Sequence, residues 1–375
     1  MLQHRLLHYR TALFERLKLA LDRAGVDLVL VHGQAAEAEQ ARQDTGSLAW
    51  ATQVHNRSLR IGEKDVLWQP IPPKARDSDL VILMQENRLM SNYPWLWGWG
   101  PTRTKVAFWG HGRNFQSAAL ASMRERWKAR FLKKVDWWFA YTDLTRHIVR
   151  DAGFPEQRIT VLNNAIDNSQ FACDLAAVGA EEISALRRQI GAPIGGLVGI
   201  FCGSLYPEKR LELLIEAGTQ VHAKRPDFRL VVIGDGPGRS MLEQAAGASW
   251  LHCVGAKRGK DKAAWFRVAQ LCLNPGLVGL HVLDSFVAGT PMITTADALH
   301  SPEICYLHHN RNGLICTGTA TAYADAVLEL IADTQRLANL RAGAQSSSAQ
   351  YSLDEMVRRF AAGILECLAR PRLRT

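Results

Sequence analysis

The stretch that decides the fold is Asn274-Pro-Gly-Leu-Val-Gly-Leu-His-Val-Leu-Asp-Ser-Phe-Val-Ala-Gly-Thr-Pro291. Here an apolar strand ends, a glycine-rich loop exposes the backbone amides of Gly279 and Leu280, and a helix begins. Such amides, with the positive end of the helix dipole, are suited to binding a diphosphate without a metal. Asp284 lies one turn inside this helix, where its carboxylate is placed to accept hydrogen bonds from a ribose diol. On this stretch alone, an acid that only complements the helix dipole is the simpler interpretation of Asp284.

Two further glycine-containing joints precede this stretch. In the first, Gly203-Ser-Leu-Tyr-Pro-Glu-Lys-Arg210, the glycine allows a tight turn before a helix, and Lys209 and Arg210 bring charge that suits a diphosphate. An ordinary strand–loop–helix joint with solvated basic residues is an equally good interpretation. The second joint, Gly234-Asp-Gly-Pro-Gly238, lacks the residue order of a dinucleotide fingerprint, so a structural turn explains it better.

These joints belong to a repeating pattern in which short apolar runs alternate with helical segments, as in α/β domains with parallel sheets. The expected strands cover residues 27–31, 79–83, 105–109, 137–141 and 159–162 in the first half, and 197–202, 228–233, 251–254, 271–274 and 291–294 in the second. The expected helices cover residues 9–24, 181–190, 210–223, 240–246, 260–269, 282–288, 320–333 and 352–368. In the first helix, Leu13, Phe14, Leu17 and Leu21 fall on one apolar face.

The pattern loosens between residues 168 and 193, which divides the chain into two doubly wound, Rossmann-like domains. We expect domains over residues 1–170 and 171–351, and a closing helix in 352–375 that packs back toward the first domain. Ligands of such sheets bind beyond the carboxyl ends of the strands, so a cleft between the two domains is the expected site. A helix begins almost at Met1, where a strand is usual. Either the first sheet lacks its first strand or the chain is truncated at its start.

Composition and charge narrow the function. No apolar run is long enough to span a bilayer, and no leader pattern follows Met1. Seven cysteines without metal-ligand spacing favour reduced thiols in the cytoplasm and argue against a zinc site. Residues 1–170 carry 24 Lys or Arg against 17 Asp or Glu, which is +7 of the total net charge of +9. This excess favours nucleotide, lipid phosphate or a membrane surface; because no nucleic-acid-binding motif accompanies it, we expect no nucleic-acid partner.

Motifs in a fixed order carry a resemblance to a known family. They are Gly-Ser-Leu-x-x-x-Lys-Arg at 203–210, Val-Ile-Gly-Asp-Gly-Pro at 232–237, Pro-Gly-x-Val-Gly-Leu-x-x-x-Asp-Ser-Phe-x-x-Gly-x-Pro at 275–291, then His300-Ser-Pro-Glu-Ile304 and Asn312-Gly-Leu314. This order resembles the retaining glycosyltransferase family 4, most specifically in the second half. The resemblance implies a GT-B fold with an acceptor-side first domain and a second domain that binds a nucleotide sugar. It also implies transfer with retention, no metal and no cofactor.

The basic residues of the family pattern transfer with one departure. In similar enzymes a basic pair holds the donor diphosphate, and it falls here at Ser204 and Lys209. Lys209 matches, whereas Ser204 has lost the charge, and Arg210 is the candidate to compensate. Gly203 supplies the turn before the pair.

The acidic residues depart as well. The family's two glutamates, with seven residues between them, fall at Gly276 and Asp284. Asp284 keeps a carboxylate for the ribose, but Gly276 offers none to the sugar, which leaves the amides of Gly279 and Leu280 among the groups that hold it. We interpret Pro-Gly-x-Val-Gly-Leu as the motif of a sub-branch; a weakened or lost activity is the alternative.

His111 and Glu303 complete the candidate site. His111 follows an expected strand between two glycines, and in similar enzymes a histidine here contacts the donor sugar or lies near the reacting carbon. It is the candidate catalytic residue, with a structural histidine as the alternative. Glu303 lies in a loop where its carboxylate is placed to reach donor or acceptor, or it is a helix-start acid after Pro302. We find no protein nucleophile, which agrees with attack by the acceptor on the leaving-group face.

The sequence therefore predicts a cytoplasmic, metal-independent, retaining hexosyltransferase for surface polysaccharide or glycolipid biosynthesis. Its partners are a nucleotide-diphosphate sugar donor and a glycan or lipid-linked acceptor. A basic stretch beside Trp127 predicts peripheral contact with an anionic membrane; a solvated helix face beside a Trp-rich core is the alternative. The basic residues are Arg124, Arg126, Lys128, Arg130, Lys133 and Lys134. The competing function is a non-catalytic GT-B protein that binds a nucleotide or glycan as a regulator or scaffold.

Overall fold

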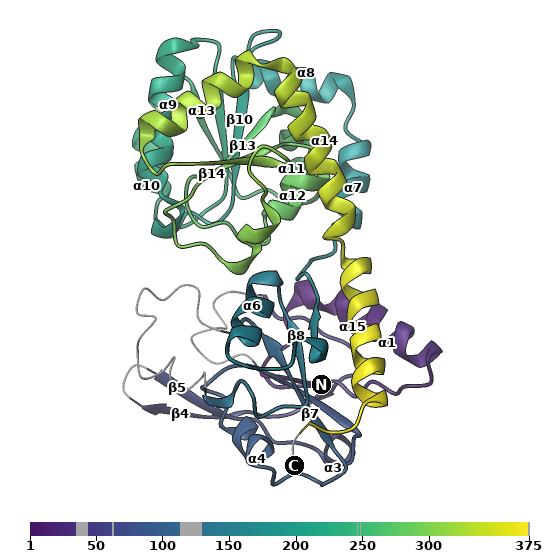
Figure 1. Cartoon of the computed structure of the whole chain (residues 1–375). Helices are drawn as coiled ribbons and strands as arrows, with labels where there is room; N and C mark the ends of the chain where they lie inside the picture. The colour runs from purple at the N-terminus through teal and green to yellow at the C-terminus, as the bar shows by residue number, and fades with distance from the viewer. Residues whose placement is uncertain (35–43, 62–63, 113–129, 246, 248, 374–375) are drawn as a thin grey trace. The chain divides into compact units, whose positions relative to one another are not determined.

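The computed structural model describes residues 1–34, 44–61, 64–112, 130–245, 247 and 249–373 (Figure 1). The chain divides into two compact units, which are Met1–Asp167 with Leu353–Thr375 (unit 1) and Asn168–Ser352 (unit 2). Within the described residues, no helix has the length and apolar character needed to cross a bilayer. Over the same part of the chain, histidine, cysteine and acidic side chains form no group that would hold a metal ion.

Unit 2 is built on a six-stranded sheet in which every neighbouring pair is parallel. The strand order is β12 (Leu251–Gly255), β11 (Arg229–Ile233), β10 (Val198–Cys202), β13 (Leu271–Leu273), β14 (Met292–Thr295) and β15 (Gly313–Cys316). The strands are almost continuously apolar because helices cover both faces of a parallel sheet. The order reverses between β10 and β13. From β10 the chain continues outward to β11 and β12, and from β13 it continues the other way to β14.

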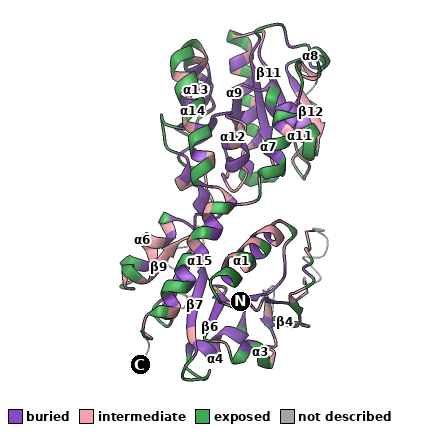
Figure 2. Ribbon diagram, turned by 90° about the vertical axis from the view of Figure 1, so that its right-hand side faces the viewer, coloured by how far each residue is buried: buried purple, intermediate pink, exposed green. Residues whose placement is uncertain are grey.

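Helices cover both faces of the unit 2 sheet. They are α7 (Ser169–Ala176), α8 (Ala180–Gln189), α9 (Leu211–Lys224), α10 (Arg239–Ala245), α11 (Gly259–Val268), α12 (Val282–Val287), α13 (Ala320–Ala332) and α14 (Thr334–Gln350). Figure 1 shows α9, α10 and α13 on one side of the sheet and α7 and α11 on the other. Figure 2 shows the strands buried and the outer helix faces exposed. The predicted strands and helices of this half are confirmed to within a few residues, but α7, β15 and α14 were not predicted.

Unit 1 contains a four-stranded parallel sheet and a smaller parallel sheet. The larger one is β6 (Leu80–Met84), β7 (Lys105–Gly110), β8 (Trp137–Ala140) and β9 (Ile159–Val161), and the smaller one is β1 (Leu2–Gln3), β2 (Val31–His32) and β3 (Thr52–Gln53). An antiparallel hairpin of β4 (Arg57–Ile61) and β5 (Lys64–Trp68) was not predicted. The short helices of this unit are η1 (His8–Arg10), α3 (Pro73–Arg76), η2 (Met90–Asn92), α4 (Tyr93–Leu96), α6 (Asp143–Asp151) and η3 (Glu156–Arg158).

The expectation of a missing first strand is wrong. Leu2 and Gln3 pair in parallel with Val31 and His32, and β1 also lies beside β6. The strand escapes a sequence pattern because it has only two residues and its second residue is a glutamine. The α-amino group of Met1 donates to the carbonyl of Val29 at 2.6 Å, and burial lowers the pKa of that amine to about 5.

The closing helix α15 (Leu353–Ala369) belongs to unit 1, where it packs on α1 (Thr11–Arg23). The predicted apolar face of α1 is confirmed, since Leu13, Phe14, Leu17 and Leu21 are all buried. From α15, the ring of Phe360 lies 4.7 Å from that of Phe139 in β8 and 5.1 Å from that of Trp109 in β7. The helix thus packs against β8 and against β7, and His111 directly follows β7.

Candidate functional site

The loops that follow β10 and β13 meet at the carboxyl edge of the unit 2 sheet. Lys209 Nζ donates to the carbonyl of Leu277 at 2.6 Å, and the amide of Leu277 donates to the carbonyl of Glu208 at 2.8 Å. This is the point where the strand order reverses. In open α/β sheets, the crevice at such a reversal is where ligands bind.

The two loops can meet because residue 276 is a glycine, since the surrounding atoms leave no room for a side chain there. A Cβ atom built on Gly276 would lie 2.5 Å from the Cα atom of Lys209 and would also overlap the Lys209 carbonyl carbon and the Glu208 carbonyl oxygen. Asn274 Nδ2 donates to the carbonyls of Gly276 and Leu277, at 3.2 Å each. The glycine that replaces the family's first glutamate is therefore a packing requirement of this loop pair.

Lys209 is a buried cation at this edge, with 8% of its surface exposed. It ends the short helix η4 (Pro207–Lys209), and its ammonium group lies beside Gly203, 3.8 Å from where a Cβ atom of that residue would be. Burial lowers the pKa of Lys209 to about 8, against weak opposing effects of Cys272, Cys202 and Glu208. Lys209 therefore carries a charge at neutral pH in a place where that charge is poorly solvated and binds an anion strongly.

Arg210 and Ser204 contribute less than the sequence suggested. The backbone of Arg210 is left-handed, with φ 55° and ψ 50°, and its guanidinium forms a two-pronged ion pair with Asp297 at 3.0 and 3.1 Å. It also donates to Thr295 Oγ1 at 2.9 Å. Ser204 is exposed. Arg210 is thus held by Asp297, and its compensation for the charge missing at Ser204 stays a prediction.

Buried Asp284 and half-buried Lys262 form an ion pair that sequence reasoning missed. Lys262 Nζ lies 3.1 Å from Asp284 Oδ2, while Oδ1 is buried and has no hydrogen-bond partner among the described residues. Burial raises the pKa of Asp284, and Lys262 opposes only part of that shift. The thiol of Cys202, at the end of β10, is within electrostatic range of Asp284, Lys262 and Lys209. Lys262 comes from α11 and has no motif around it, so only the fold places a second cation here.

The glycine-rich loop presents open backbone groups in front of α12. The carbonyls of Gly279 and Leu280 accept hydrogen bonds from Val282 and Leu283, both at 3.0 Å. The amides of Gly279 and Leu280 donate to no other atom of the described residues. A Cβ atom on Gly279 would find its nearest neighbours at 3.8 Å, an ordinary van der Waals distance, so a methyl group would fit there without overlap.

Glu303 is buried, with 4% of its surface exposed, in the 3-10 helix η5 (Pro302–Tyr306). Hydrogen bonds connect the start of this helix to the glycine-rich loop. Val278 accepts from the amide of Ser301 at 3.0 Å and donates to His300 Nδ1 at 3.1 Å, while His300 Nε2 bonds the carbonyl of Thr295 at 2.7 Å. Unit 2 thus brings Gly203, Lys209, the 276–280 loop and Asp284 together, with η5 adjoining them.

His111 lies at the carboxyl edge of the sheet in unit 1. Its ring stacks on that of Tyr141 with centroids 3.9 Å apart and planes 13° from parallel. Gln85 holds the following residue in place, because Gly112 donates to Gln85 Oε1 at 2.8 Å and accepts from Gln85 Nε2 at 3.1 Å. The ring is half-buried, so one part of it remains open to a ligand.

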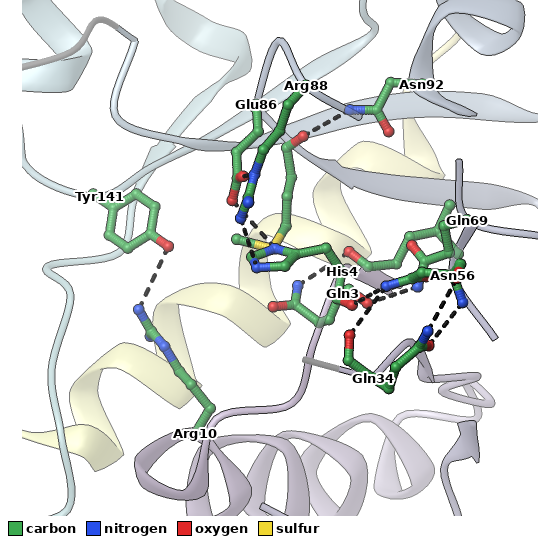
Figure 3. Close-up of polar contacts among 12 residues, drawn as sticks. Gln3, His4, Arg10, Gln34, Asn56, Gln69, Glu86, Arg88, Asn92 and Tyr141 are labelled. Carbon is green, nitrogen blue, oxygen red and sulfur yellow. Dashed lines mark hydrogen bonds and ion pairs between the residues drawn. The ribbon is translucent and has the colours of Figure 1, made fainter. Parts of the chain in front are cut away.

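A polar network near the start of the chain was also missed (Figure 3). Glu86 pairs with Arg88 at 2.8 Å and with His4 at 3.3 Å. Burial opposes the charge on Glu86, but hydrogen bonds and charges from His4 and Arg88 lower its pKa to about 2. Asn56 donates to the carbonyl of His4 at 2.6 Å. This network fixes the chain between β1 and η1 and leaves Glu86 ionised.

The stretch expected to contact membranes falls largely outside the described residues, since Arg124, Arg126, Trp127 and Lys128 all lie there. Of the rest, Lys133 and Lys134 are exposed, whereas Phe131 is buried. The tryptophans divide into two groups. Trp109, Trp137 and Trp138 belong to the core, but Trp68, Trp97 and Trp99 are 47%, 50% and 74% exposed. Trp68 and Trp99, with Trp95, line a pocket of about 520 Å³.

Comparison with known proteins bears on the family. Residues 196–333 match the family model described as glycosyl transferases group 1. A D-inositol 3-phosphate glycosyltransferase of Thermobispora bispora is 28% identical over 236 residues, which are 58% of this chain and 52% of that protein. An alpha-monoglucosyldiacylglycerol synthase of Acholeplasma laidlawii is 22% identical over 142 residues, which are 36% of this chain and 35% of that protein. The chain thus matches about half the length, or less, of these curated relatives.

Solved structures bear on the fold. HepE of Anabaena, crystallised with UDP, gives a TM-score of 0.67 at 15% identity and covers 97% of this chain and 99% of its own. Sucrose-phosphate synthase of Thermosynechococcus elongatus gives a TM-score of 0.68 at 12% identity, with 98% of each chain covered. At such identities the likeness concerns the fold alone. The chain has the two-domain α/β fold of GT-B glycosyltransferases, and its residues 196–333 are similar to the glycosyl transferases group 1 family.

Proposed function

We propose that this protein is a retaining, metal-independent hexosyltransferase with a nucleotide-diphosphate sugar as donor and a glycan or lipid-linked molecule as acceptor. The observation that carries the proposal is the buried ammonium group of Lys209, bonded to the loop that presents the free amides of Gly279 and Leu280. The names of the curated relatives and the UDP in the HepE crystal support it. The names of these relatives also favour an enzyme over a non-catalytic GT-B protein.

The chemistry follows from where charge develops. The bond between the anomeric carbon and the β-phosphate oxygen breaks, which leaves positive charge on the sugar ring and negative charge on the diphosphate. Lys209 and the two amides stabilise that departing anion. The acceptor hydroxyl attacks from the leaving-group face, its oxygen forms the new bond to the anomeric carbon, and its proton passes to a diphosphate oxygen. The configuration is retained and no protein nucleophile is needed.

A panel of nucleoside diphosphates and nucleotide sugars tests the function. A ligand that binds only the folded state raises the free energy of unfolding, by about 2.7 kcal/mol when its concentration is 100 times the dissociation constant, and so raises the melting temperature. At least one compound should therefore stabilise the protein in a thermal shift assay and release nucleoside diphosphate on incubation. A protein that no compound stabilises, and that hydrolyses none of them, would overturn the proposal.

Asp284 is expected to hold the nucleoside part of the donor. Asp284→Asn removes the carboxylate that faces the ribose and leaves Lys262 without its partner. We expect nucleoside diphosphate to bind weaker by about 1–3 kcal/mol, the range for a charge-assisted hydrogen bond. Isothermal titration calorimetry measures this affinity. Asp325→Asn is the control, since Asp325 of α13 forms an exposed ion pair with Lys224 of α9. Equal affinity in both variants would remove Asp284 from the site.

His111 is expected to act on transfer and not on nucleotide binding. His111→Ala should leave the affinity for nucleoside diphosphate unchanged and lower kcat/KM by about tenfold to a hundredfold, the loss of one polar contact in the transition state. His111→Phe is the matched control, because it keeps a ring to stack on Tyr141 and removes the nitrogens. Activity retained by the phenylalanine variant would assign His111 to packing alone.

We further propose that the protein works in the cytoplasm, in surface polysaccharide or glycolipid synthesis, and contacts anionic membrane peripherally. Exposed Trp68, Trp97 and Trp99 support this, because tryptophan favours the membrane interface. We expect Trp97→Ser/Trp99→Ser to reduce co-sedimentation with anionic vesicles at low salt several-fold. Leu19→Ser, on exposed Leu19 of α1, should not change it. If the unaltered protein ignores such vesicles, membrane contact is excluded.

A further inference from the structure

Arg10 is a buried cation without an anionic partner among the described residues. Its side chain is 5% exposed, close to the 7% of Arg5. Arg5, however, pairs with Asp44 at 2.5 Å. The contact of Arg10 is a long hydrogen bond from Nη2 to the hydroxyl of Tyr141 at 3.5 Å, and Nη1 is buried with no partner. A buried charge of this kind is costly unless something compensates it.

Aromatic rings compensate part of that cost. The guanidinium carbon lies 5.0 Å from the ring centre of Trp109, 5.6 Å from that of Tyr141 and 5.4 Å from that of Tyr9. Such cation–π contacts are attractive, and more so where the cation is desolvated. These rings offer the guanidinium no hydrogen-bond acceptor apart from the Tyr141 hydroxyl. Nη1 is the donor group of Arg10 that the described residues leave without an acceptor.

Arg10 lies where α/β sheets usually bind their ligands. Trp109 is in β7 and Tyr141 directly follows β8, so the guanidinium lies at the carboxyl edge of the unit 1 sheet. His111 stacks on the same Tyr141 ring. Trp109 and Tyr141 are buried, while Tyr9 and His111 are half-buried, so the partly exposed rings near the group are those of Tyr9 and His111.

Glu86, the acid that Figure 3 draws together with Arg10, is paired with other residues. Figure 3 shows the carboxylate of Glu86 turned toward Arg88 and His4, and it shows Arg10 reaching separately from its helix to the Tyr141 hydroxyl. The protein therefore neutralises Arg88 internally but not Arg10. This difference has a functional explanation if an external anion pairs with the guanidinium of Arg10.

We propose that Arg10 binds a phosphate or carboxylate group carried by the acceptor, with Tyr141 and His111 beside it. This rests on the proposed function and adds the acceptor's chemical class, an anionic sugar or a lipid with an anionic headgroup. The planar guanidinium matches the two oxygens of either anion through parallel N–H···O bonds. An anion held next to His111 would place the neighbouring hydroxyl of the acceptor near the candidate catalytic histidine.

The first experiment uses inorganic phosphate as the probe, titrated into the full-length protein carrying Lys209→Met so that the donor site does not respond. Arg10→Gln in that background should weaken phosphate binding at least tenfold, and Arg10→Lys should weaken it less. Arg23→Gln, which changes an exposed arginine at the end of α1, the helix that follows Arg10, should leave it unchanged. Acetate tests the carboxylate in the same way, and phosphatidylglycerol vesicles test a lipid source of the phosphate. Arg10-dependent binding to vesicles alone would assign the anion to a lipid headgroup.

Arg10→Met keeps an apolar stem against Trp109 and serves if the glutamine variant does not fold. The proposal would be overturned if phosphate, acetate and vesicles each bound the Arg10→Gln or Arg10→Met variant as well as they bind Arg23→Gln. Each variant must show native circular dichroism. The outcome is independent of the donor. Loss of nucleotide-sugar binding would contradict the proposed function, whereas the phosphate titration in the Lys209→Met background reads the Arg10 site alone.

Discussion

Lys209→Met is expected to weaken nucleoside diphosphate binding by about 1–3 kcal/mol, which is about 5- to 150-fold. The transfer rate should fall further, by about a hundredfold to a thousandfold, because the leaving diphosphate carries more charge in the transition state than in the bound donor. Methionine keeps the stem of the side chain and removes only the ammonium group. The measurements are calorimetric affinity for the nucleoside diphosphate and kcat/KM for transfer.

The matched control is Lys260→Met, which removes an exposed lysine from α11 in the same unit. It should change neither quantity more than about twofold, because exposed ion pairs contribute little. Lys209→Met also removes the hydrogen bond to the Leu277 carbonyl, so its melting temperature must be measured in parallel. A folded Lys209→Met protein with full affinity would contradict the assignment of Lys209 to the diphosphate.

The pH dependence offers a separate check on Lys209. Burial lowers its pKa to about 8, so the ammonium form is lost as the pH rises through that value. Affinity for nucleoside diphosphate should therefore be flat at neutral pH and fall by up to about tenfold per unit above pH 8. In the unfolded chain the same lysine titrates near 10.5, so between these values the unfolded state holds more protons. The contribution of Lys209 to unliganded stability thus rises with pH while the affinity falls, and Lys209→Met should flatten both curves.

Much of unit 2 was predictable because its elements are long and its joints are marked. Glycine after β10 and β13 and the apolar runs between them fix the alternation of strand and helix. The elements that escaped prediction lack such marks. β1 has two residues, and the hairpin of β4 and β5 carries arginine, lysine and aspartate in strands that a buried-sheet pattern excludes. Long-range pairing, not local preference, makes these segments strands.

The candidate site was predictable only where it follows the chain. Lys209 and the 276–280 loop follow strands directly, so the motif carries them. Lys262 reaches Asp284 from a helix 22 residues earlier, and Arg210 turns onto Asp297, 87 residues later. Neither pairing leaves a signal in a single sequence, because it depends on how two elements pack. The charge of a residue was readable from the sequence, but its partner was not.

Gly276→Ala is expected to destabilise unit 2 by at least about 3 kcal/mol, at the upper end of what overpacking costs. The added Cβ would lie 2.5 Å from the Cα atom of Lys209, and the atoms in its way belong to the backbone, which cannot rotate aside. Gly276 is not among the residues with a positive φ, so the cost is steric and not conformational. At about 2–4 °C per kcal/mol for a domain of this size, the melting temperature should fall by about 6–12 °C.

Gly276→Glu restores the acid of the family pattern and should be worse than alanine. If the glycine were merely a lost functional residue, the glutamate would raise sugar binding or transfer. The loop contact predicts the reverse, because the larger side chain separates Leu277 from Glu208 and Lys209 and breaks the hydrogen bonds between them. Nucleotide binding should therefore disappear in any Gly276→Glu protein that folds. A stable variant with improved transfer would show that the position is functional and that the loop yields.

Gly279→Ala is the matched comparison three residues along the same loop. Its Cβ would have no neighbour nearer than 3.8 Å, and its φ is not positive, so stability should change by no more than about 0.5 kcal/mol. If a diphosphate approaches the free amides of Gly279 and Leu280, the new methyl group lies in its path and affinity should still fall. The two variants thus separate two requirements for glycine. Position 276 needs it for the fold and position 279 for the ligand, so a melting curve should detect the first change and a titration the second.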